Sequence, residues 1–140
     1  MEEKHFIFFI RILMVAFAFT AILFIIFPAG IIDLLNRIGT FFGDFERLDS
    51  AEKGIWYALS ISNMVVITIL CFLIQARPSD ARGPLFALIA GKSSSSLVSF
   101  YMFFYERMAF ALIITSIVDG AIAVLLILGY ILTSKSSLPR

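Results

Sequence analysis

The sequence predicts an all-α integral membrane protein, a four-helix antiparallel bundle with an interfacial amphipathic helix after the first span. Hydrophobic residues make up 61% of the 140 residues, charged residues make up 15%, and the mean hydropathy is +1.01. Soluble domains are roughly 45–50% apolar and about 25% charged. Four stretches are also long enough to cross a bilayer, which takes about 20 apolar residues each.

The four predicted spans belong to a single membrane domain, residues 1–140, and cover residues 6–27, 54–76, 84–105 and 108–132. Two acidic residues precede the first span and no small-residue cleavage site follows it, so we expect a retained helix rather than a signal peptide. Pro28 ends this span because proline lacks an N–H and disfavours helix in the preceding residue. Asp49-Ser50-Ala51-Glu52 has the pattern of a capping box before the second span.

The chain must reverse near Tyr105–Arg107, although this segment contains neither glycine nor proline. A single helix over residues 84–132 would be about 73 Å long, more than twice the thickness of the hydrocarbon core. The resulting topology places the N-terminus, the second loop and the C-terminal tail on one side of the membrane. Basic residues favour this side as cytoplasmic, in what we expect to be a bacterial inner membrane. The terminal side carries Lys4, Arg11, Arg77, Arg82, Lys135 and Arg140, against Arg37, Arg47, Lys53 and Arg107 on the other.

Residues 31–48 have apolar side chains three, four and seven positions apart, with polar side chains between them. This pattern predicts an amphipathic helix lying in the plane of the membrane surface, which Gly39 and Gly43 would weaken into two pieces. An extramembrane helix packed on its neighbours is the alternative. The residues expected at the interface are Arg37, Phe41, Phe42, Phe45 and Trp56.

Two charged residues, Lys92 and Asp119, lie inside predicted spans. A charge in hydrocarbon is costly unless it is paired or hydrated, and it marks a candidate functional site. In antiparallel helices both residues lie within about two turns of the midplane, so we expect them to pair or to share a water-filled pocket. Neighbouring polar side chains extend the predicted cluster, which comprises Ser60, Asn63, Lys92, Ser95, Ser96, Ser99, Thr115 and Asp119.

Three interpretations of this cluster remain open. It can be structural, because serine allows close helix approach and a buried ion pair sets the register of two helices. It can be a site for a ligand, a proton or an ion, or it can contact a partner subunit.

Several chemistries are excluded by the composition. The single cysteine, Cys71, allows no internal disulfide, and the single histidine, His5, allows no bis-histidine haem or multi-histidine zinc site. We find no phosphate-binding loop, catalytic triad or metalloprotease motif, so we expect no enzyme, cofactor or metal. A net charge of +1 argues against nucleic acid. The expected partners are the lipid bilayer and other membrane subunits or further copies of the chain.

The layout of the segments resembles that of DoxX-like small four-helix membrane proteins, which have about 140 residues, a longer first external loop and short later loops. This resemblance implies an accessory role, since members of that group are linked to respiratory or sulfur-redox membrane complexes as small subunits. We therefore expect a non-enzymatic accessory or assembly subunit. One alternative is a small oligomeric carrier or channel that uses Lys92 and Asp119. The other is a membrane-embedded enzyme or lipid-binding protein that uses a cavity between the same two residues.

Overall fold

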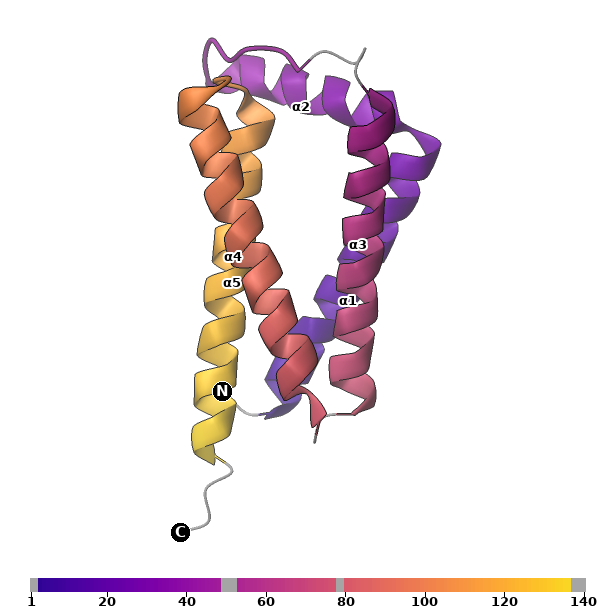
Figure 1. Ribbon diagram of the computed structural model, residues 1–140, viewed down its shortest axis with the longest axis vertical. Coiled ribbons are helices and arrows are strands. Elements are labelled where there is room, and N and C mark those ends of the chain that lie inside the picture. Colours follow the sequence, from indigo (N-terminus) through magenta and orange to yellow (C-terminus); the bar gives the residue numbers. More distant parts are fainter. Residues whose placement is uncertain (1–2, 49–52, 78–79, 137–140) are drawn as a thin grey trace.

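The structure, a computed structural model, describes residues 3–48, 53–77 and 80–136. These residues form helices and no strands, and the helices are α1 (Glu3–Ile26), α2 (Pro28–Phe42), α3 (Lys53–Ala76), α4 (Arg82–Tyr105) and α5 (Phe110–Ser136). The start of α1, the turn between α3 and α4, and the end of α5 lie at one end of the molecule (Figure 1). We call this the terminal end. Helix α2 runs across the opposite end, the α2 end, so the four long helices alternate in direction as predicted.

Four helices in the described part of the chain are long and apolar enough to cross a membrane: α1, α3, α4 and α5. Their bounds differ from the predicted spans by a few residues. Helix α5 begins at Phe110 rather than at residue 108, because the N–H of Ala109 donates to the carbonyl of Arg107, 2.8 Å away, and closes a turn. This turn is the reversal predicted near Tyr105–Arg107. The capping box predicted at residues 49–52 lies outside the described residues.

Helix α2 begins earlier and ends earlier than the predicted amphipathic segment, residues 31–48. Pro28 occupies its first turn, where a missing N–H removes no helical hydrogen bond, so Phe27 alone separates α2 from α1. Gly43 ends the helix with a positive φ of 156°, a conformation that favours glycine. The expected division into two pieces does not occur at Gly39, because α2 continues through Gly39, which is buried.

Residues 43–48 form a loop that returns along α2 rather than the last turns of a helix. The side-chain amide of Asn36 donates to the carbonyl of Leu48 and accepts its N–H, both at 3.1 Å. The N–H of Glu46 donates to the carbonyl of Met108 at 3.0 Å, in the turn between α4 and α5. These bonds tie α2 and the loop to the α4–α5 turn.

Aromatic side chains pack beneath this junction. The ring of Phe42 stacks on that of Phe110 with 5.5 Å between centroids. Phe45 contacts the rings of Phe103 and Phe110 at 6.3 and 5.5 Å. The lack of a Cβ at Gly39 permits this approach, since a Cβ there would lie 2.7 Å from the Cβ of Phe110. We call Phe42, Phe45, Phe103 and Phe110 the aromatic cluster.

The apolar core lies toward the terminal end, where the four long helices converge. Its buried members are Phe6, Ile10, Leu13, Ile67, Cys71, Ile74, Leu85, Leu88 and Leu126. From this core the α1–α3 pair and the α4–α5 pair diverge toward the α2 end (Figure 1).

The outer surface of the bundle is also apolar on each of the four long helices. One large apolar side chain from each helix illustrates this, with exposed fractions of 57–74%: Phe8 on α1, Phe72 on α3, Phe86 on α4 and Ile117 on α5. A helix that is apolar all round suits either a large protein core or a membrane span. A chain of 140 residues offers no such large core.

We expect Gly39→Ala to lower the free energy of unfolding by about 1–3 kcal/mol, the usual cost of overpacking. The new methyl group would meet the Cβ of Phe110, which moves only with the backbone of α5. Thermal unfolding in detergent measures the change. Gly30→Ala in the same helix is the control, since its nearest neighbour would be the Cβ of Phe27 at 3.8 Å, an ordinary contact. Equal stability of the two variants would contradict this packing.

Candidate functional site

The candidate site lies in the seam between α4 and α5. Buried residues recur three, four or seven positions apart on both helices, at Leu85, Leu88, Lys92, Ser99 and Phe103 on α4 and at Ser116, Asp119, Ala123 and Leu126 on α5. This spacing places them on one face of each helix. Two opposite charges therefore fall inside the seam, where Lys92 is 3% exposed and Asp119 is 6% exposed.

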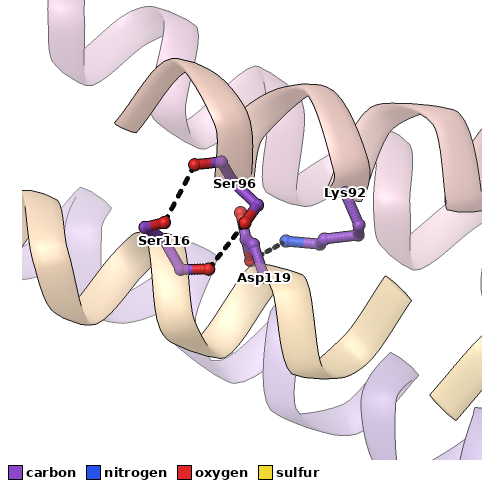
Figure 2. A network of polar contacts seen from close by, with 4 residues as sticks. All are labelled: Lys92, Ser96, Ser116 and Asp119. Carbon is purple, nitrogen blue, oxygen red and sulfur yellow. Dashed lines mark hydrogen bonds and ion pairs between the residues drawn. The ribbon is translucent and has the colours of Figure 1, made fainter. Parts of the chain in front are cut away.

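The pairing of Lys92 with Asp119 that the sequence predicted is present (Figure 2). Nζ of Lys92 lies 2.7 Å from Oδ1 of Asp119 and donates a hydrogen bond to it. The same Nζ lies 4.1 Å from the centroid of the Phe17 ring on α1, over its face. A cation over an aromatic face is attracted to the negative face of the ring. The ammonium of Lys92 therefore links α4 to both α5 and α1.

A second polar contact lies about one turn closer to the α2 end. The hydroxyl of Ser96 donates to the carbonyl of Ser116 at 2.8 Å, and the hydroxyl of Ser116 donates to the carbonyl of Ser96 at 2.9 Å (Figure 2). Gly120 permits this close approach, because a Cβ there would lie 2.9 Å from Oγ of Ser96. Each serine satisfies its hydroxyl on the opposite backbone, an arrangement typical of close helix pairs in membranes.

The structure brings together only part of the predicted cluster. Lys92, Ser96 and Asp119 make the contacts described above, and Ser99 is buried farther along α4. Ser95 and Ser60 are half-buried and make no hydrogen bond to the described residues.

Two predicted members, Asn63 and Thr115, are exposed and do not join the cluster. On α5 the residue that shares the buried face with Asp119 is Ser116, three positions before it, and Thr115 lies to the outside. On α3 Asn63 lies four residues before the core residue Ile67, on the same side of the helix, but in the half where the two helix pairs diverge, and it is exposed.

Two residues that take part in the contacts of this site, Ser116 and Phe17, were not predicted from the sequence. Ser116 stands one turn before Asp119, as Thr115 does, so spacing alone did not separate them. Phe17 is one of 16 phenylalanines, and no sequence signal distinguishes it from the others.

The predicted interfacial residues differ in exposure. Arg37 and Phe41 on α2 are exposed, Phe41 to 87%, and Phe42 is largely exposed although it stacks on Phe110. Phe45 instead packs in the aromatic cluster. The side chain of Trp56 lies outside the described residues.

No group of three or more potential metal ligands occurs among the described residues. Cys71 is a free thiol and is fully buried in the apolar core. The ion pair is therefore the chemically distinctive part of the site. It holds one positive and one negative group together midway along two helices.

We expect Lys92→Met and Asp119→Leu each to destabilise the bundle by about 3–5 kcal/mol, because each leaves the opposite charge buried without its partner. The double variant should cost less than the sum of the two single changes. Unfolding in detergent measures the cycle, with Lys4→Met at the exposed start of α1 as the control. Additive effects would show that the two side chains do not depend on each other.

We expect Gly120→Ala to be less stable than Gly91→Ala by about 1 kcal/mol, the usual contribution of one hydrogen bond. Both changes improve helix propensity by a similar amount. The methyl group at residue 91 would meet nothing within 4 Å, whereas the one at residue 120 must displace the hydroxyl of Ser96 from its acceptor. Thermal unfolding of the two variants side by side measures the difference, and equal values would argue against the close approach.

Comparison with known protein families, with curated proteins and with solved structures finds no significant match. The likeness to DoxX-like proteins therefore stays a prediction that depends on the layout of the segments. The features that bear on function are therefore this chain's own surface and site.

Proposed function

We propose that this chain is an integral protein of a bacterial inner membrane and serves as a non-enzymatic accessory or assembly subunit of a larger membrane complex. One observation carries this proposal. The polar contacts inside the bundle join its own helices, through Lys92 with Asp119 and Ser96 with Ser116. The outer surface is apolar on all four long helices, and it is the surface left for interaction.

Membrane insertion is supported by this surface. Apolar area in contact with water costs about 25 cal/mol per Å², and large exposed apolar patches on soluble proteins cause association. A bilayer removes the cost, because lipid tails surround the exposed side chains. Helices α1, α3, α4 and α5 have the length and hydropathy that such an environment requires.

The charges at the two ends support cytoplasmic termini. In the described residues the terminal end carries Lys4, Arg11, Arg77, Arg82 and Lys135, with Glu3 and Asp80 as acidic neighbours. Acidic and basic residues are mixed at the α2 end. An excess of lysine and arginine in short loops marks the cytoplasmic side.

Helix α2 supports an interfacial position. It lies across the end of the bundle, where the membrane surface would be (Figure 1). It exposes Leu34 and Phe41 beside Asp33 and Arg37, so apolar and charged groups meet on its outer side. Such a helix suits contact with head groups or with a neighbouring subunit. The accessory role implied by the DoxX-like layout agrees with this assignment.

A second candidate function, a small carrier or channel, is favoured by the position of the ion pair. Lys92 and Asp119 lie near the middle of candidate spans, where ionisable residues often mark proton or ion pathways. An oligomer would supply the further helices that a pathway needs.

Native electrophoresis and flux measurements distinguish the two functions. Membranes solubilised in a mild detergent should yield the 15.7 kDa chain in a discrete assembly larger than the chain with its micelle. Proteoliposomes containing the purified protein and a trapped pH dye should show no proton or cation flux above that of empty vesicles. Flux that Asp119→Asn abolishes while the helix content stays unchanged would contradict the subunit role and support a carrier.

A further inference from the structure

The core-facing sides of α3 and α4 change from apolar to polar toward the α2 end. On α3, Ser60 and Asn63 lie seven and four residues before the core residue Ile67, within about 40° of it around the helix. On α4, Ser95 lies seven residues after the core residue Leu88, about 20° from it. The α1–α3 and α4–α5 pairs diverge over this half of the bundle (Figure 1), so the apolar core does not continue between these polar residues.

The polar residues of the two helices lie at matching depths. Asn63 on α3 and Ser95 on α4 are each ten residues from the end of their helix at the α2 end, which is about 15 Å. Ser60 and Ser99 are seven and six residues from that end, about 10 Å. The region where the pairs diverge therefore has polar groups on both of these helices, at two levels.

These side chains have no hydrogen-bond partners among the described residues. Asn63 is exposed although it lies on the core-facing side of α3, and Ser60 and Ser95 are half-buried. Ser99 is only 9% exposed and is also without a partner in this part of the chain. Closer to α2, the hydroxyl of Tyr57 is buried and has no partner in the described chain either.

An amide and a buried hydroxyl in this position require water or another polar group. Placing them among hydrocarbon without a hydrogen bond is costly, and lipid tails offer neither donors nor acceptors. A serine hydroxyl can bond to a carbonyl of its own helix, so the requirement comes chiefly from Asn63 and Tyr57. Water meets it, because a polar region with several donors and acceptors holds ordered water.

The two ends of this region differ. Helix α2 crosses the α2 end (Figure 1), but of its residues, all of which the structure describes, Gly39 alone is fully buried. The underside of α2 is therefore loosely packed and leaves a route from the membrane surface. Toward the terminal end, the ammonium of Lys92 lies over the Phe17 ring, with the apolar core behind it. Lys92 is 3% exposed, so water from the α2 side stops there.

We propose that the region between the helix pairs is a water-filled vestibule that opens at the α2 end and is lined by Tyr57, Ser60, Asn63, Ser95 and Ser99. It admits water and small hydrophilic solutes as far as Lys92 and provides no path across the membrane. The inference rests on the proposed membrane insertion. It assigns Asn63, Ser60 and Ser95 to one surface, separate from the contacts between Ser96 and Ser116.

Cysteine accessibility in vesicles of phosphatidylcholine and phosphatidylglycerol tests the vestibule. The wild type gives the background, because its native Cys71 is fully buried in the core. Asn63→Cys and Ser95→Cys each place a thiol in the vestibule. Ser62→Cys and Ser94→Cys are the matched controls, since these neighbours are exposed at the same depth but point to the outside, about 140° from Ile67 and about 160° from Lys92.

A small, charged methanethiosulfonate reagent is supplied on both sides of the membrane. It should modify Asn63→Cys and Ser95→Cys at least about tenfold faster than their neighbours and the wild type, because the reactive thiolate forms where water reaches the sulfur. Circular dichroism of each variant confirms that the helices remain folded.

The outcomes separate the vestibule from the proposed function. Equally slow modification within both neighbouring pairs, in a chain that resists alkaline extraction, would overturn the vestibule and leave membrane insertion intact. Modification of Asn63→Cys by a lipid-soluble maleimide but not by the charged reagent would show that lipid fills the region, and would also overturn it. Equally fast modification of all four variants would overturn membrane insertion and the vestibule with it.

Discussion

The ion pair between Lys92 and Asp119 sets how the long helices face one another. Each residue advances an α-helix by about 100°, so a register shift of one residue in α4 or α5 would turn a charge out of the seam. With the pair in place, both charges are buried and compensated. The Phe17 ring beneath the ammonium extends the constraint to α1. Removing one residue of such a pair destabilises the fold more than replacing both with apolar residues, because the remaining charge then stays buried alone.

Apolar contacts lie on both sides of this polar layer. The core at the terminal end packs all four long helices together, and the aromatic cluster at the α2 end fastens α2 onto the α4–α5 turn. At two glycines, Gly39 and Gly120, a side chain of the neighbouring helix leaves no room for a Cβ. Packing of apolar and aromatic side chains thus holds the helices together at the two ends of the bundle, and the ion pair holds them together in the middle.

The contrast between the interior and the outer surface connects the fold to the proposed role. Inside the bundle, Ser96 and Ser116 satisfy each other and Lys92 satisfies Asp119. Outside, apolar side chains cover the long helices. A bundle whose buried charges pair within the chain and whose outer surface is apolar is suited to assembly with other membrane helices.

The number, order and approximate length of the long helices could be predicted from the sequence, because hydropathy and span length are local properties. Lys92 and Asp119 could also be predicted as a candidate site, since charges within apolar stretches are rare. The side of each helix that faces inward depends on packing between helices and is not encoded locally. A helix that is apolar all round carries little information about its rotation, so packing against the neighbouring helices buries Ser116 and leaves Thr115 exposed. Likewise, only the tertiary packing places Phe45, in the loop after Gly43, in the aromatic cluster against Phe110 of α5.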